Sequence, residues 1–379
     1  MLLYNHTNRG TYWRALGFAR ALVRRGHNVT ILCTSPHARL RRAQGVVDGV
    51  RLVEFPDLLP GSLRSGWDLW NTLTRLAWLR GKNFDLVHAF ETRPVVIFPA
   101  LAVKRRGARL FLDWCDWFGK GGSVEERPNP LMRAILRPVE TFFENHYRTR
   151  ADGTTVINSF LRQRAISLGV KAEDIRLIRN GADTTIPVIN CRSARQALGL
   201  PTEGPWIGFV GSTYTRDAQF MAAAFDHVLA AVPQARLILA GYFNRSIEAW
   251  VQNPSAIIRS GVVKYHDLYT YLAACDVCWL PLCDSGANRG RWPYKLTDYI
   301  TVARPTISTA VGDLAEVIPQ YGLGLVTPVD VERFAEETLS LLRDEIRAQA
   351  IGQTARRAAE EVFDWDKLTE ELEAFYLGR

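Results

Sequence analysis

Segments typical of β-strands alternate with segments typical of α-helices along the whole 379-residue chain. This alternation predicts parallel sheets covered by helices on both faces, because a parallel strand can rejoin its sheet only after a crossover connection. The predicted strands are 1–4, 28–33, 50–55, 85–89, 109–113, 153–157, 175–178, then 206–210, 236–240, 257–258, 276–280, 306–308 and 324–326. The predicted helices are 13–25, 67–80, 95–105, 131–150, 160–168, then 217–232, 267–273, 294–302 and 331–343.

The alternation is interrupted once, which predicts two Rossmann-like, doubly wound α/β domains. Segment 181–204 contains Pro187 and Pro201 and ends at Pro205, so it is expected to be a linker. The expected domains are 1–182 and 183–363. Such domains bind ligands at the carboxyl ends of their strands, in a cleft.

The net charge of +8 favours anionic partners such as nucleotides, phosphosugars or acidic lipid surfaces. The basic residues are scattered along helices and form no known nucleic-acid module, so no nucleic-acid partner is expected. Asn5, His6 and Arg9 interrupt any apolar run at the start, and no apolar run later in the chain is long enough to span a bilayer. A cytoplasmic location is therefore expected.

The six cysteines are expected to be reduced thiols. Cys275 and Cys278, with Cys283 nearby, have the spacing of metal ligands. Because they flank a predicted buried strand and no second pair follows, packing thiols are expected and no metal is predicted.

Segment 292–318 combines a helix, a short strand, a glycine loop and a second helix. Lys295 and Asp298 share one helix face, so the cation would meet a diphosphate while the carboxylate accepts sugar hydroxyls. Gly312 would let a ligand approach the backbone before a helix start, with Glu316 beyond it. Two structural alternatives are a surface ion pair for Lys295–Asp298 and a capping box for Asp313–Glu316.

This segment resembles the nucleotide-sugar signature of GT-B glycosyltransferases, especially the large retaining family 4. Asp298 stands for the family's ribose-binding glutamate, whereas Thr301 and Ala303 replace its usual alanine and glycine. The matching positions are Pro293, Lys295, Leu296, Tyr299, Pro305, Gly312 and Glu316. The resemblance implies two Rossmann-like domains facing across a cleft, with the C-terminal helix, 364–379, crossing back to the N-terminal domain.

Two glycine turns are further candidates for binding the donor. Gly10 and Thr11 lie between a predicted strand and a helix, where backbone N–H groups would face an anion. The second turn contains Gly211 and Ser212, followed by Arg216. Family members usually have an arginine where Ser212 lies and a lysine where Asp217 lies, so Arg216 is expected to be the second phosphate-binding cation. The alternatives are an ordinary strand–helix turn and a solvated arginine.

An acidic, aromatic and glycine-rich loop follows the strand at 109–113. Asp113 and Asp116 are expected to contact the donor sugar or the acceptor, and the structural alternative is a capped loop with core tryptophans. Near the second domain's signature, Gly290 occupies the position of the first acid of the family's Glu-x7-Glu pattern. Asn288, Asp284 and Arg291 are therefore candidates for binding the donor hydroxyls, and the alternative is a different mode of donor binding.

Segment 64–82 contains Trp67, Trp70, Leu73 and Trp78 among basic residues. It would suit peripheral contact at the inner face of a membrane, although a tryptophan-rich core helix is the more ordinary interpretation.

These observations lead to a hypothesis of hexosyl transfer from a UDP- or GDP-sugar to a sugar, glycan or lipid-linked acceptor in glycan biosynthesis, with retention and without a metal or other cofactor. The predicted catalytic residues are Asp116, Arg216 and Lys295. The predicted binding residues are Gly10, Thr11, Asp113, Gly211, Ser212, Asn288, Asp298, Gly312 and Glu316. The alternatives are a catalytically weak nucleotide-sugar or glycan-binding subunit and a nucleotide-sugar epimerase.

Overall fold

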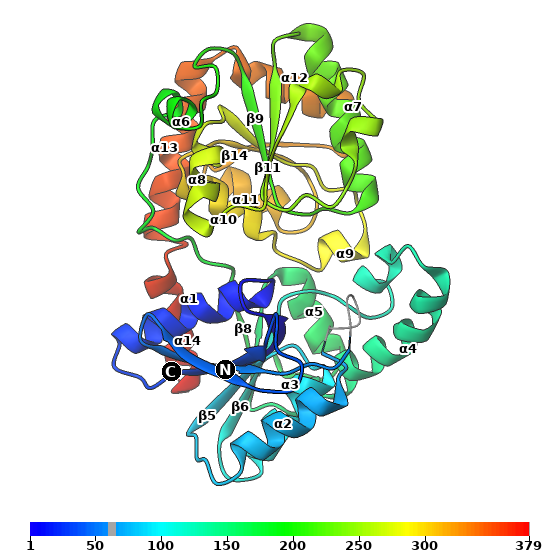
Figure 1. Ribbon diagram of the computed structural model, residues 1–379, viewed down its shortest axis with the longest axis vertical. Helices are drawn as coiled ribbons and strands as arrows, with labels where there is room; N and C mark the ends of the chain where they lie inside the picture. Colours follow the sequence, from blue (N-terminus) through cyan, green and yellow to red (C-terminus); the bar gives the residue numbers. More distant parts are fainter. Residues whose placement is uncertain (60–65, 379) are drawn as a thin grey trace. The chain divides into compact units, whose positions relative to one another are not determined.

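The computed structural model describes residues 1–59 and 66–378 (Figure 1). It divides into two compact units, each an α/β layer structure. The amino-terminal unit comprises Met1–Gly181, Gly290–Trp292 and Trp365–Arg379, and the carboxy-terminal unit comprises Ala182–Arg289 and Pro293–Asp364.

The amino-terminal unit has an eight-stranded sheet in the order β3-β4-β2-β1-β5-β6-β7-β8. All pairings are parallel except that of β3 with β4. The strands are β1 Leu2–His6, β2 Thr30–Thr34, β3 Ala43–Val47, β4 Val50–Phe55, β5 Leu86–Phe90, β6 Arg109–Trp114, β7 Gly153–Val156 and β8 Ile175–Leu177. The helices are α1 Thr11–Arg24, α2 Leu69–Leu79, α3 Pro94–Lys104, α4 Pro130–His146, α5 Ser159–Ser167 and α14 Trp365–Tyr376.

The last helix belongs to this unit, where α14 packs against α1. The Trp365 ring lies edge-on to Phe18, with 5.0 Å between the ring centroids. Gly17 makes the contact close, because a Cβ atom there would lie 2.3 Å from the Trp365 ring. The C-terminal helix thus packs on the amino-terminal unit, where the Trp365 ring fits against Gly17 because glycine has no side chain.

The carboxy-terminal unit has a fully parallel six-stranded sheet in the order β11-β10-β9-β12-β13-β14. The strands are β9 Trp206–Val210, β10 Arg236–Ala240, β11 Ile257–Gly261, β12 Val277–Leu280, β13 Thr306–Thr309 and β14 Gly324–Thr327. The helices are α6 Cys191–Ala197, α7 Thr215–Ala231, α8 Tyr265–Ala273, α9 Gly286–Arg289, α10 Tyr294–Thr301, α11 Leu314–Gln320, α12 Val331–Leu342 and α13 Glu345–Glu361.

Both sheets reverse their strand order at the first strand of the unit. In the carboxy-terminal unit the reversal lies between β9 and β12, and in the amino-terminal unit it lies between β1 and β5. Crossovers leave opposite faces of the sheet on either side of this point, which opens a crevice at the carboxyl ends of the strands. The two-domain Rossmann-like fold predicted from the sequence is confirmed, and its topology puts a binding crevice in each unit.

Several local predictions differ from the structure. The segment 181–204 is not a plain linker, because it contains α6, whose N-cap Asn190 accepts a hydrogen bond from the Arg192 amide. The antiparallel edge strand β3 and the helix α13 were not predicted. The first strand continues to His6, so it is longer than the predicted 1–4. No helix among residues 1–59 and 66–378 has the length and hydropathy needed to cross a bilayer.

Candidate functional site

Lys295 lies at the carboxyl end of β9. It is the second residue of α10, and its Nζ donates a hydrogen bond to the Ser212 carbonyl oxygen at 2.8 Å. The same ammonium group lies 5.1 Å from the centre of the Phe209 ring. The carbonyl and the ring both favour a cation and hold it beside the turn that follows β9.

The turn itself is built by Gly211, whose φ of +69° is in the left-handed region. Its N–H donates to the Ala240 oxygen at 2.9 Å, which continues the pairing of β9 with β10 up to the turn. Ser212 is exposed, and Arg216 is exposed on the first turn of α7. The structure therefore brings Gly211, Ser212 and Lys295 together, with Arg216 on the helix that follows.

Asp298 lies on the face of α10 that carries Lys295, and its side chain is buried. Burial raises the pKa of Asp298 to about 7, although a hydrogen bond from the Tyr269 hydroxyl and the charge of Lys295 oppose the shift. The Tyr269 oxygen lies 3.1 Å from Asp298 Oδ1, to which its hydroxyl donates, and it lies 2.7 Å from the Tyr265 hydroxyl, from which it accepts a hydrogen bond. Tyr269 was not predicted from the sequence, where its only signal is a pair of tyrosines four apart in α8.

Asn288 is buried, and its amide nitrogen is already engaged. Its Nδ2 donates to Asp217 Oδ1 at 3.0 Å and to the Cys283 oxygen at 2.8 Å. Asp217 also accepts the Cys283 N–H at 2.8 Å. Asp217, which occupies the position of the family's usual lysine, therefore links α7 to the loop after β12. The Asn288 amide holds the same loop by bonding to both Asp217 and the Cys283 oxygen.

Gly312 lies in the loop between β13 and α11 with a φ of +59°. A Cβ atom there would lie 3.5 Å from the Arg289 carbonyl oxygen, so the loop approaches α9 closely. Glu316 is exposed on the first turn of α11. The alternative capping box does not form, because the Asp313 side chain makes no capping hydrogen bond to this helix.

In the amino-terminal unit, Gly10 and Thr11 form the turn between β1 and α1. Gly10 has a φ of +54°, and a Cβ atom there would lie 2.5 Å from Asn5 Nδ2. The Thr11 side chain is buried, and its hydroxyl donates to Asn5 Oδ1. Asn5, which the sequence analysis did not single out, therefore shapes this turn.

Asp113 is fully buried at the end of β6, where Arg14 binds it through two hydrogen bonds. Arg14 Nε lies 3.0 Å from Asp113 Oδ2, and Arg14 Nη2 lies 2.9 Å from Oδ1. The Thr155 hydroxyl and the Cys115 thiol also donate to this carboxylate. The carboxylate predicted to contact substrate is thus occupied by partners inside the unit.

Asp116 lies in the loop after β6 and is half-buried. Burial raises the pKa of Asp116 to about 6, while the charges of Arg291 and Arg93 lower it. The backbone of Asp116 pairs with that of Arg291 in an antiparallel bridge. The Asp116 side chain therefore lies on a loop whose backbone is held in place by this bridge.

Two buried glutamates, Glu144 and Glu91, accept hydrogen bonds from the backbone of this loop. Glu144 on α4 accepts the N–H groups of Phe118 and Gly119 at 2.9 and 2.8 Å, together with Trp114 Nε1 at 3.0 Å. Glu91 accepts the Cys115 N–H at 2.9 Å and pairs with Arg148. Burial raises the pKa of Glu91 to about 8 and also raises that of Glu144. Neither glutamate could be predicted from a local sequence pattern, because the contacts of both join distant segments.

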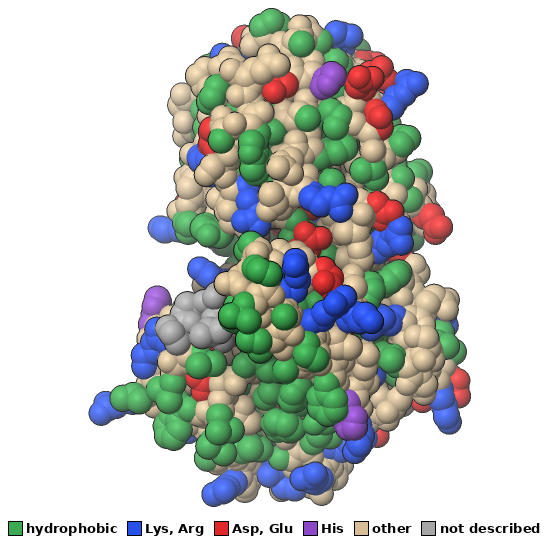
Figure 2. Space-filling model, turned by 90° about the vertical axis from the view of Figure 1, so that its right-hand side faces the viewer, with side chains coloured by type: hydrophobic (Ala, Val, Ile, Leu, Met, Phe, Trp, Pro, Cys, Tyr) green, Lys and Arg blue, Asp and Glu red, His purple; other side chains and the backbone are tan. Residues whose placement is uncertain are grey.

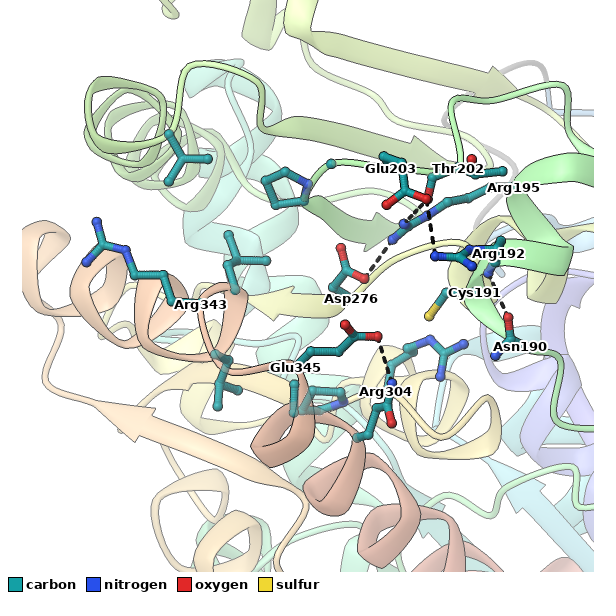
Figure 3. Close-up of a pocket in the computed structure, with 18 of the residues that line it drawn as sticks. Asn190, Cys191, Arg192, Arg195, Thr202, Glu203, Asp276, Arg304, Arg343 and Glu345 are labelled. Carbon is teal, nitrogen blue, oxygen red and sulfur yellow. Dashed lines mark hydrogen bonds and ion pairs between the residues drawn. The ribbon is translucent and has the colours of Figure 1, made fainter.

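A separate cavity of about 590 Å³ opens at the amino edge of the carboxy-terminal sheet (Figure 3). Its charged side chains are largely paired with one another: Arg195 with Asp276, and Arg192 with Glu203. Arg304 donates to the Ala273 and Ile189 oxygens. This cavity contains none of the predicted site residues and lies at the opposite sheet edge from Lys295.

All six cysteines lie within the described residues, and none of them forms a disulfide bond there. Within the described ranges, no group of three or more histidine, cysteine or acidic side chains has a metal-binding arrangement.

Two family models match this chain, one in each unit. Residues 9–181 match a glycosyl transferase 4-like domain, and residues 204–344 match the group 1 glycosyl transferases. A GDP-mannose-dependent monoacylated alpha-(1-6)-phosphatidylinositol monomannoside mannosyltransferase of Corynebacterium glutamicum is 26% identical over 187 residues. That match covers 48% of this chain and 49% of the relative, so it spans about half of the relative's length.

Solved structures share the fold. Sucrose-phosphate synthase from Thermosynechococcus elongatus superposes with a TM-score of 0.77 at 18% identity, covering 98% of this chain and 94% of the other. HepE from Anabaena, solved in complex with UDP and glucose, gives a TM-score of 0.70 at 14% identity, covering 100% and 99%. Taken together with the two family models, which match most of the chain, these similarities show that it belongs to the group 1, family 4-like glycosyltransferases of GT-B fold.

Proposed function

We propose that this protein transfers a hexose from a nucleoside diphosphate sugar to an acceptor hydroxyl, with retention and without a metal ion. The observation that carries the proposal is the position of the Lys295 ammonium group over the Gly211–Ser212 turn, at the point where the sheet order reverses. A fixed cation at this edge suits a diphosphate, and Asp298 on the same helix face suits a ribose.

In the reaction, the bond between the anomeric carbon and the diphosphate oxygen breaks, and the acceptor oxygen forms the new bond on the same face of the sugar, which gives retention. The acceptor proton passes to the departing diphosphate oxygen. Negative charge grows on the departing diphosphate. Lys295 and Arg216 would stabilise that charge, and Lys295 needs little reorganisation because the Ser212 carbonyl already holds it. In this proposal the two cations supply the charge that a metal would otherwise provide.

The remaining site residues fall into two groups. Ser212, Gly312 and Glu316 are exposed around the donor edge and would line the nucleotide sugar, whereas Asn288 would support the loop after β12. In the amino-terminal unit, the Gly10–Thr11 turn and Asp116 would contact sugar or acceptor. We assign Asp113 a positioning role, because its carboxylate is engaged by Arg14.

A uridine or guanosine diphosphate sugar is the proposed donor. UDP is bound in the HepE structure, and the corynebacterial relative is named for GDP-mannose. That relative's name also gives a glycolipid acceptor, which supports a sugar, glycan or lipid-linked acceptor for this chain.

The first test is thermal stability against a panel of nucleoside diphosphates and nucleotide sugars. A ligand at about 100 times its dissociation constant is expected to stabilise the protein by about 2.7 kcal/mol. One base should stabilise selectively, and its sugar form should release nucleoside diphosphate when acceptor is added. Stabilisation without release would indicate a binding subunit, and an epimer formed without acceptor would indicate an epimerase. No response to any nucleotide would overturn the proposal.

Nucleotide affinity is expected to fall as the pH drops below 7. Asp298, whose pKa is raised to about 7, accepts two hydroxyl groups only as a carboxylate, which predominates above that pH. One unit below the pKa about a tenth of the groups are ionised, so binding at pH 6 should approach a tenfold loss. Calorimetry at pH 6 and 8 measures this. Asp298→Asn should bind weakly at both values, and an unchanged pH dependence in that variant would contradict the assignment.

A further inference from the structure

Helix α4 exposes a row of large apolar side chains. Leu131, Ile135, Val139 and Phe142 recur at helical spacing, and we call them the α4 outer face. Leu131 is 67% exposed, and Ile135 and Phe142 are each 52% exposed. Side chains of this size at successive turns form a contiguous stripe, which a solvated helix seldom carries.

Exposed apolar side chains also lie on two other helices of the same unit. Phe98 of α3 is partly exposed and packs edge-on against Phe143 of α4, with 5.9 Å between the ring centroids. On α2, Trp70 and Leu73 are exposed. Figure 2 shows hydrophobic side chains gathered over a broad area of this unit, with lysines and arginines at its margins.

This distribution partly corrects the prediction for segment 64–82. Trp78 is buried against Phe55 and belongs to the core, while Trp70 and Leu73 remain exposed. Residues 64 and 65 lie outside the described part of the chain. The larger apolar row lies on α4, which the sequence analysis did not consider as a surface.

The charges beside the α4 outer face are mainly basic, although Arg137 pairs with the partly exposed Glu125 at 2.8 Å. A hollow of about 650 Å³ next to Phe142 is lined by Lys120, Arg137 and His146 and contains no acidic side chain. The two acids of α4, Glu140 and Glu144, are buried and point inward. Anionic headgroups would therefore meet cations beside the stripe without facing an exposed carboxylate of this helix.

We propose that the α4 outer face docks onto a bilayer of anionic phospholipid, with its apolar side chains at the acyl boundary and phosphate groups at Lys120 and Arg137. The inner face of the same helix holds the loop with Phe118 and Gly119 through Glu144. Docking would therefore bring that loop next to the lipid surface. The proposal goes beyond glycosyl transfer and does not require it.

Co-sedimentation of the full chain with vesicles tests the proposal. The protein should bind vesicles of equal parts phosphatidylglycerol and phosphatidylcholine, and bind pure phosphatidylcholine more weakly. Ile135→Ser combined with Phe142→Ser should weaken binding by about tenfold or more. Lys120→Glu combined with Arg137→Glu should remove the preference for anionic vesicles and its dependence on salt.

Val46→Ser is the matched control, because Val46 is 71% exposed on β3 of the same unit and lies outside the face. Circular dichroism and the response to nucleotide should be unchanged in every variant. Equal binding by wild type and the Ile135/Phe142 variant, or no binding by wild type, would overturn the proposal. The proposal would also be overturned if wild type forms a dimer in solution without vesicles and the Ile135/Phe142 variant is a monomer. The α4 outer face would then join two copies of the chain. Nucleotide binding in the same samples reports separately on the transferase proposal.

Discussion

Lys295→Ala is expected to lower turnover by about 10²- to 10³-fold, which is the usual effect of removing one preorganised electrostatic contact to a transition state. The ammonium group is held by the Ser212 oxygen and the Phe209 ring, so its position is set before a ligand arrives. Its charge would act on the diphosphate as the glycosidic bond breaks, and the loss should appear in kcat as well as in kcat/KM. Initial rates of nucleoside diphosphate release measure the effect.

The controls separate charge from fold. Lys171→Ala removes an exposed lysine at a short helix of the other unit and should leave the rate unchanged. Lys295→Arg keeps the charge in another shape and should retain more activity than the alanine variant. Because Lys295 is not a core residue, the unfolding temperature without ligand should stay near that of wild type. A rate close to wild type in Lys295→Ala would remove this residue from the mechanism.

The sequence was sufficient where a signal is local. Strands β9 and β10 have the predicted bounds because buried parallel strands are nearly continuous apolar runs between polar turns. Lys295 and Asp298 were placed on one face because residues three apart on a helix are neighbours. By contrast, β3 is almost entirely exposed and has no apolar pattern.

Other features depend on contacts that the sequence does not reveal. The buried positions of α13 are mainly alanines, together with Gly352, so the apolar signal is weak. A Cβ atom at Gly352 would lie 2.2 Å from the Ala303 oxygen, which explains why small residues are needed there. Glu144 binds Trp114 across 30 residues of sequence, and Asn288 binds Asp217 across 71. Such pairings follow only from the completed fold.

Asp113→Ala is expected to destabilise the amino-terminal unit by about 3–5 kcal/mol, the usual effect of removing one partner from a buried ion pair. Arg14 is 2% exposed and Asp113 is fully buried, so the variant would leave a cation without its counter-charge. The Arg14 guanidinium also donates to the Ile178 and Arg179 oxygens, both at 2.8 Å. It would therefore stay in place, still buried and uncompensated.

Hydrogen exchange in urea, followed at peptides from β6 and α1, assigns the change to this unit without assuming that the whole chain unfolds in one step. Asp85→Ala removes an exposed acid beside β5 and should have almost no effect. Combining Arg14→Met with Asp113→Leu should be less destabilising than Asp113→Ala, because neither charge remains buried. If amide hydrogen exchange in Asp113→Ala is as slow as in wild type, the Arg14–Asp113 pair contributes little to the stability of this unit.

The pH dependence gives a second check with a definite sign. Burial alone raises the pKa of Asp113, but the charge and hydrogen bonds of Arg14 outweigh it, so the pKa lies below its ordinary value. The unfolded chain therefore takes up the proton first as the pH falls, and the stability that Asp113 contributes is fully present above about pH 4. Below that pH the difference in the free energy of unfolding between wild type and Asp113→Ala should become smaller. A constant difference from pH 7 to strongly acidic conditions would mean that packing, and not the ion pair, makes Asp113 important for the unit.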